Sequence, residues 1–258
     1  GASDATAPSD ASALVAIADR LDTLVGCFGV GLAPTGTADP FALRRAALGV
    51  LRTLLDRGWN LSLTDAVGLA YARLEGVKLD LSLEDLQKKL GDFFRDRLRG
   101  LLVAELPTDV VDACLAASFD DPVDVRARAR ALAELPADVR ARAGEVFKRA
   151  TNIAKDAPAG DPKAPKEIEA HPHASEIALF DAFVSLVSEL RKASASSAWP
   201  QAFAAIAAFA PALHKFFEDV FVMVEDQAIR ENRLRLMRAI SEQCSKIAHF
   251  QLLSGKQG

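Results

Sequence analysis

A stripe of cationic and amide side chains in the second half of the chain has the spacing of one helix face. Lys148, Asn152 and Lys155 fall at offsets of zero, four and seven, and Arg149 lies on the flank of the same stripe. Lysine and arginine contact phosphates and asparagine can hydrogen-bond base edges, so this combination suits a nucleic acid better than a small anion. Because proteins read RNA mainly at unpaired loops, a helical bundle bearing this stripe is a candidate RNA reader.

Other residue patterns that could carry chemistry are weaker. The glycines of Gly26–Gly31 read G-x-x-G-x-G, which is neither a dinucleotide fingerprint nor a phosphate loop. His171 and His173 could bind a metal, but no third or fourth ligand stands near them in the sequence, and we interpret them as surface histidines. Asp19 and Asp22 share a helix face and are interpreted as surface acids. Spacing alone therefore indicates no enzyme.

Composition describes a globular chain with an uneven charge distribution. Of the 258 residues 50% are apolar and 26% are charged, with a net charge of −4. Residues 40–57, 86–99 and 226–256 each carry +3 and residues 136–156 carry +2, so the remainder is acidic. Each basic window fits either a polyanion-binding surface or an ordinary solvated helix face.

Several function classes and locations are disfavoured by the sequence. The longest nearly unbroken apolar stretch, residues 203–213, has 11 residues, whereas a membrane span needs about 20. The three cysteines form no CxxC pair, which argues against a disulfide framework or a zinc site and favours a reduced, cytoplasmic protein. The opening Gly1-Ala2-Ser3 has the character of an artificial leader.

Helical periodicity runs through nearly the whole chain, so we predict an all-α fold. Pro211 is expected to begin a helix whose apolar stripe extends from Leu213 to Val224, and a last helix from Ile229 is expected to pack along it as an antiparallel neighbour. The other predicted helices cover residues 11–26, 40–57, 63–75, 82–105, 107–117, 122–134, 136–156, 175–193 and 199–209. Residues 26–39 are predicted to form a loop, and the proline-rich residues 157–174 a surface linker.

Four sequence segments resemble, in order, the β subunit of bacterial glycyl-tRNA synthetases. They are ADRLDTLVGCFGVGLAPTGTADPFALRRAALGVLR (Ala18–Arg52), FFRDRLRGLL (Phe93–Leu102), FKRATNI (Phe147–Ile153) and FFEDVFVMVEDQAIRENRLRLM (Phe216–Met237). The last two bracket a region similar to the DALR-type anticodon-binding bundle shared with arginyl-tRNA synthetases, with Asp226–Arg230 at the name-giving motif. The resemblance covers nearly the whole chain, but only the C-terminal part of the family's subunit.

The resemblance implies a division of the chain and a set of tRNA-binding residues. Residues 1–57 would end an HD-type module, residues 58–135 form a helical connector, and residues 136–258 form the antiparallel anticodon-binding bundle. The tRNA-facing residues implied by the resemblance are Lys148, Arg149, Asn152, Lys155, Arg230, Asn232 and Arg233. Arg230 and Arg233 have an alternative interpretation as intramolecular ion pairs, with Asp226 and Glu231, that fix the last two helices.

The resemblance also implies what the chain does not do by itself. In this family of class II aminoacyl-tRNA synthetases, a separate α subunit activates glycine with ATP, and the β subunit contributes tRNA binding within an α2β2 assembly. We therefore expect a part of a glycine–tRNA ligase that binds tRNA(Gly), has no catalytic residue or cofactor of its own, and lies in the cytoplasm.

Two other interpretations stay open. Asp19 falls where the HD-type module has its final aspartate, so one alternative is the remnant of a metal phosphohydrolase, although the earlier histidine positions of that pattern are missing. The other is a helical scaffold for subunit assembly that binds no RNA. A metal-supplemented phosphatase assay and co-purification with the α subunit would separate these from an RNA-binding role.

Overall fold

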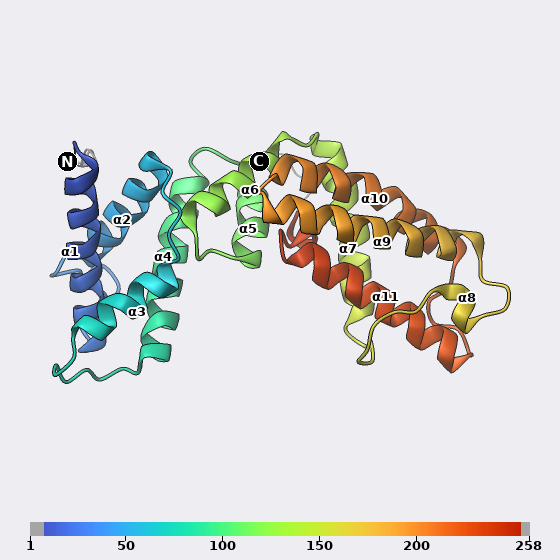
Figure 1. Cartoon of the computed structure of the whole chain (residues 1–258), viewed down its shortest axis with the longest axis horizontal. Helices are drawn as coiled ribbons and strands as arrows, with labels where there is room; N and C mark the ends of the chain where they lie inside the picture. The colour runs from blue at the N-terminus through green and yellow to red at the C-terminus, as the bar shows by residue number, and fades with distance from the viewer. Residues whose placement is uncertain (1–7, 254–258) are drawn as a thin grey trace. The chain divides into compact units, whose positions relative to one another are not determined.

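The computed structural model describes residues 8–253, so the opening Gly1-Ala2-Ser3 lies outside the described residues. The prediction of an all-α fold is confirmed, since residues 8–253 contain helices and no strand (Figure 1). The helices are α1 (Asp10–Gly29), α2 (Leu43–Arg57), α3 (Leu63–Arg73), α4 (Leu83–Leu102), α5 (Thr108–Ala117), α6 (Pro122–Glu134), α7 (Ala137–Ala154), α8 (Pro165–Ile168), α9 (Ala174–Ala195), α10 (Trp199–Asp219), α11 (Gln227–Ser245) and the short 3-10 helix η1 (Phe250–Leu252).

The helices pack into two compact units whose boundary falls inside α6. The first unit contains the residues up to Glu105 together with Ser118–Arg126, and the second contains Leu106–Ala117 and the residues from Ala127 onward. The division at residues 57 and 135 that the sequence suggested rests on family resemblance rather than on packing, and it stays a prediction.

The first unit is a small bundle of α1 to α4, whose apolar faces meet in a core that includes Leu24, Leu51 and Phe94. Ser62 and Ser82 begin α3 and α4 by accepting backbone N–H bonds three residues on. The carboxylate of Asp39 accepts from the backbone N–H groups of residues 43 and 44, which explains why α2 begins at Leu43 rather than at residue 40.

The second unit is built around α7, α9, α10 and α11. A short turn joins α9 to α10, and the two helices lie side by side as an antiparallel pair (Figure 1). The core is rich in phenylalanine, including Phe147, Phe203 and Phe250. Arg128 is only 2% exposed, and its Nη1 donates to the carbonyl oxygens of Cys114 and Ile247, so this buried cation also satisfies two backbone groups.

Two predictions about the C-terminal helices are wrong. Pro211 does not begin a helix but lies inside α10, because buried residues on both sides of it, Phe209 and Leu213, hold one continuous apolar stripe together despite the hydrogen bond that proline cannot donate. The helix ends at Asp219, before Val224. The main neighbour of α11 is α7 rather than its predecessor α10.

The two predicted interruptions are also more ordered than expected. Helix α1 continues to Gly29, so the loop before α2 starts later than residue 26. Residues 157–174 contain α8, whose Pro165 is buried, and His173 begins α9 by accepting the Ser175 N–H on its Nδ1 at 3.2 Å. Among the helices of residues 8–253, none is both long and apolar enough to cross a membrane.

Candidate nucleic-acid interface

Helix α7 presents the predicted cationic stripe to solvent. Its buried side, which includes Val146, Phe147 and Ala150, belongs to the core of the second unit. Lys148, Arg149 and Asn152, on its other side, and Lys155, the residue that directly follows the helix, are all exposed. An RNA strand therefore has access to cations for its phosphates and to an amide for a base edge on a single helix.

Contacts on both sides hold α7 in place. The hydroxyl groups of Thr151 and Ser241 are 2.9 Å apart and join α7 to α11. Gly144 lies so close to Leu253 that a Cβ atom there would come within 2.8 Å of the Leu253 carbonyl oxygen, so only glycine fits without a shift. On the flank, the Arg149 guanidinium lies 4.3 Å from the centre of the Phe217 ring of α10. The stripe is thus carried by a fixed helix.

The start of α11, the second predicted contact region, is turned largely toward the protein. The Asp226 carboxylate caps the helix by accepting the Ile229 N–H at 3.1 Å. Arg230 is half-buried, and its Nη1 donates to the carbonyl oxygens of Val224 at 2.8 Å and Glu225 at 3.3 Å. Arg230 therefore holds the chain that precedes its own helix.

Asn232 and Arg233 are buried, with 3% and 6% of their surfaces exposed. Asn232 makes two bonds to the backbone of Lys163, accepting from its N–H at 2.8 Å and donating to its carbonyl at 3.0 Å. Arg233 donates from Nε and Nη2 to Oε2 of the buried Glu176, at 2.9 and 2.6 Å. These polar groups are therefore occupied inside the protein, not offered to RNA.

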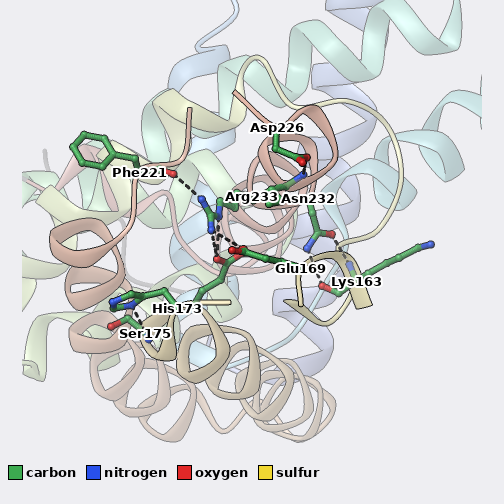
Figure 2. Close-up of polar contacts among 10 residues, drawn as sticks. Lys163, Glu169, His173, Ser175, Phe221, Asp226, Asn232 and Arg233 are labelled. Atoms are coloured by element: carbon green, nitrogen blue, oxygen red, sulfur yellow. Dashed lines mark hydrogen bonds and ion pairs between the residues drawn. The ribbon is translucent and has the colours of Figure 1, made fainter. Parts of the chain in front are cut away.

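Arg233 also connects two further segments to the same buried pair. Its Nη2 lies 3.3 Å from the carboxylate of Glu169, and its Nη1 donates to the Phe221 carbonyl at 2.9 Å (Figure 2). The sequence interpretation of an intramolecular ion pair is thus correct in kind for Arg233, but the partners are Glu176 and Glu169 instead of Asp226 and Glu231. Glu231 pairs with Arg235, at 2.9 Å.

The same helix fixes the proline-rich segment. Arg235 donates to the Ala159 carbonyl at 3.1 Å, and Arg238 donates to the Gly160 carbonyl at 2.7 Å. Gly160 has a φ of 109°, a conformation that favours glycine. With Asn232 holding Lys163, residues 159–163 lie along α11 as a fixed strap, which composition alone did not indicate.

The position of Arg233 in the sequence contains a signal that could have indicated its burial. Arg233 stands four residues after Ile229 and seven before Ile240, so it falls on the apolar stripe of its own helix. The burial of Asn232 has no such local signal, because the strap that covers it comes from residues far away in the chain. Sequence reasoning also missed the exposure of Phe221: it included this residue in an apolar helix stripe, whereas 86% of its surface is exposed.

The remaining candidates from the sequence form no site. Asp19, Asp22, His171 and His173 are exposed. Within the described part of the chain, no three His, Cys, Asp or Glu side chains come together in a way that could hold a metal ion.

The first unit contains an open apolar groove of about 840 Å³. Its walls come from α1, α3 and the residues that follow α2, and they include Leu14, Ile17, Trp59 and Leu69. Leu14 and Leu69, which both line this groove, are 58% and 72% exposed, so the groove presents large apolar side chains to solvent.

A helix that exposes cationic and amide side chains in one row carries the groups that contact RNA phosphates and base edges. The family model described as "DALR anticodon binding domain" matches residues 145–249, which include the stripe of α7 and all of α11. The model described as "Glycyl-tRNA synthetase beta subunit" matches residues 1–116.

Relatives extend these matches over nearly the whole chain. It is 40% identical to the glycine–tRNA ligase β subunit of Anaeromyxobacter dehalogenans over 99% of its own length and 36% of the relative's. The corresponding subunits of Citrifermentans bemidjiense and Geotalea uraniireducens are 39% and 42% identical, over 95% and 94% of this chain and 35% of theirs. The chain belongs to the glycyl-tRNA synthetase β-subunit family, and it spans about a third of the length of these relatives.

Proposed function

We propose that this chain is the anticodon-binding part of a glycine–tRNA ligase β subunit. It docks the anticodon stem-loop of tRNA(Gly) and so supports the ATP-dependent attachment of glycine, which is catalysed together with a separate α subunit. The observation that carries the proposal is the exposed stripe of Lys148, Arg149, Asn152 and Lys155 within the segment that matches an anticodon-binding model.

The residues of the stripe divide into two roles. Lys148 and Lys155 contact phosphates and supply affinity that does not depend on sequence. Asn152 lies between them on the stripe and is the residue able to distinguish a base by hydrogen bonding. Arg149, already held over Phe217, contributes charge at the edge of the surface.

Asn232 and Arg233 have no place in this contact set, because their polar groups are bonded within the protein. Arg230 keeps only a partial role, since its Nη1 holds two backbone carbonyls. In the complete enzyme, the α subunit would hold ATP and glycine, and an α2β2 assembly in the cytoplasm would bring the bound tRNA to it.

Filter-binding titrations test the proposal directly. The chain should bind a glycine tRNA more tightly than other tRNAs, and log K should fall linearly with log salt concentration as counterions are released. Equal, salt-insensitive affinity for every RNA would refute the proposal.

Two single substitutions test the division of roles. Lys148→Ala should weaken binding to all RNAs alike and reduce the salt slope by about one. Asn152→Ala should leave the salt slope unchanged and reduce the preference for glycine tRNA over a tRNA with another anticodon, by about 1–3 kcal/mol. If both variants behave identically, Asn152 does not read a base.

The groove of the first unit favours a second candidate function, that of a scaffold for subunit assembly. Its exposed Leu14 and Leu69 offer an apolar surface that a helix of another subunit could cover. Retention of the chain on an immobilised α subunit, lost in Leu14→Asp and Leu69→Asp and independent of RNA, would support this role. It would stand beside RNA binding only if the titrations above also succeed.

A further inference from the structure

The segment that joins α10 to α11 displays two large apolar side chains to solvent. Phe221 is 86% exposed and Met223 is 67% exposed, whereas Val220 and Val222 are each 7% exposed. Val220 has extended dihedral angles, and the backbone then bends at residues 222 and 223, where the Val224 N–H donates to the Val222 carbonyl at 3.1 Å. The two valines are buried, and Phe221 and Met223 are the exposed side chains of the segment.

The backbone of this segment is fixed by the arginines that sequence analysis assigned to RNA. Arg233, held by the buried Glu176, donates to the Phe221 carbonyl at 2.9 Å. Arg230 donates to the carbonyl oxygens of Val224 and Glu225. Figure 2 shows the Phe221 ring directed away from the Arg233 cluster although its own carbonyl points into it. The ring is therefore presented by backbone that is already ordered, which lowers the entropic cost of binding.

The segment also begins next to a cation of α7. Arg149 lies 4.3 Å from the centre of the Phe217 ring, and Phe221 follows Phe217 by four residues. Four residues span at most about 14 Å, so the exposed ring and a phosphate-binding guanidinium lie within reach of a few consecutive nucleotides.

From this arrangement we propose that Phe221 is a stacking platform for an unpaired base of the RNA that α7 binds. The inference rests on the proposed function and adds a named contact to it. Every nucleobase has an aromatic face, so a rigid, exposed phenylalanine can hold a splayed base without hydrogen bonds to it, and the exposed, flexible Met223 two residues further on can adapt to the base edge. Arg233 is then a positioning residue, which shapes the platform without touching RNA, and Arg230 holds the same segment through its Nη1.

The charges around the platform separate its contribution from that of α7. Glu225 and Asp226 follow it in the chain, and the Lys215 ammonium group before it is paired with Asp219 at 2.8 Å. The platform therefore adds no phosphate contact. Its loss should weaken binding without changing the number of counterions released, whereas loss of a lysine of α7 should change both.

The experiment measures binding of the anticodon stem-loop hairpin of a glycine tRNA to the chain and its variants over a range of salt concentrations. Phe221→Ala and Phe221→Leu should each weaken binding about 5- to 100-fold with an unchanged salt slope. Phe221→Trp should restore affinity to within about twofold, since tryptophan keeps a stacking face. Val184→Ala, which shortens another exposed apolar side chain (56% exposed), is the matched control and should bind as the unmodified chain does.

An abasic series identifies the partner base. Each loop nucleotide of the hairpin is replaced by an abasic one, and the series is measured with the unmodified chain and with Phe221→Ala. At one position the abasic penalty should be large for the unmodified chain and absent for Phe221→Ala, because base and ring contribute only together.

The outcomes distinguish the platform from the function on which it rests. If Lys148→Ala weakens binding and Phe221→Ala does not, the platform is refuted and the proposed function stands. If Phe221→Leu binds as tightly as the unmodified chain, the contact is apolar but not stacking, and the platform is again refuted. If the chain binds no hairpin at all, both proposals fall.

Discussion

The stripe of α7 and the start of α11 contain the same kinds of residues and have opposite surroundings. Lys148 and Asn152 stand exposed on α7, whereas Asn232 and Arg233 on α11 are buried and bonded to other parts of the chain. Both groups belong to segments that resemble the family, and both contain cationic and amide side chains suited to RNA. Only the packing around them decides which group is available to a ligand.

A cationic or amide side chain has a structural role where it holds distant segments of the chain together. Arg233 joins Glu169, Glu176 of α9 and the 220–225 segment through one guanidinium, because its planar fork can donate in several directions at once. Lys148, on a flexible stem facing solvent, has no such task. Substitutions in the two regions should accordingly affect different properties of the molecule.

The largest effect is expected from Arg233→Ala. The change leaves Glu176, only 3% exposed, as an unpaired buried carboxylate, and it should lower the free energy of unfolding of the second unit by about 3–5 kcal/mol. Urea unfolding followed by tryptophan fluorescence measures it. The chain has two tryptophans, so a Trp59→Phe background leaves Trp199 as the reporter of the second unit.

A double variant separates the loss of a partner from the loss of the pair. Arg233→Met combined with Glu176→Leu removes both charges while keeping apolar volume, and it should be clearly more stable than Arg233→Ala. If the Arg233→Ala variant unfolds at the same urea concentration as the unmodified chain, Arg233 is not a structural residue, and the contrast between the two regions disappears.

The two asparagines provide a matched pair for the next prediction. Asn232→Ala leaves the N–H and carbonyl of Lys163 without their partners, which should cost about 1–3 kcal/mol and loosen the strap. Limited trypsin digestion, followed by mass spectrometry, should then show faster cleavage after Lys163. Asn152→Ala, on exposed α7, should be cut at the rate of the unmodified chain. Equal cleavage rates for the two variants would show that Asn232 does not hold the strap.

Charge removal on α7 should have the converse effect. Lys148→Ala combined with Lys155→Ala should reduce the salt slope of RNA binding by about 1.5 and leave the free energy of unfolding within about 0.5 kcal/mol of its original value. Filter binding and urea unfolding of the same preparation check both halves of this statement. A large loss of stability would mean that α7, like α11, uses its cations for structure.

Sequence patterns predicted the all-α fold and most helices because those features depend on local periodicity. They failed where a decision depended on distant residues. Pro211 was expected to begin a helix because proline suits a first turn, but α10 continues through it since its apolar stripe is buried on both sides. Likewise, residues 157–174, which contain the strap, were expected to be a surface linker because of their prolines and charges, yet α11 fixes the strap at four carbonyl or amide groups.

In the candidate site, too, the features that depend on local sequence could be predicted and those that depend on distant residues could not. The exposure of the α7 stripe follows from the apolar residues on its opposite side, which any helical projection displays. The burial of Arg233 could have been read from its place on the apolar stripe of α11, but its partners Glu169 and Glu176 could not, since they lie more than fifty residues earlier in the chain. Phe221 could not be distinguished from a core residue by its type.

Arg149 shares a property with each of the two regions, and its substitution should have the smallest effect on stability and RNA binding. It is exposed on α7, yet its guanidinium rests over Phe217, and Arg149→Ala should lose that cation–π contact at a cost of about 0.5–1 kcal/mol of stability. Arg149→Lys should retain part of it. If the guanidinium stays over the ring when RNA binds, Arg149→Ala should change the salt slope less than Lys148→Ala does. An equal change in slope would show that Arg149 leaves Phe217 to contact a phosphate, and the cationic surface of α7 would then extend to the base of the 220–225 segment.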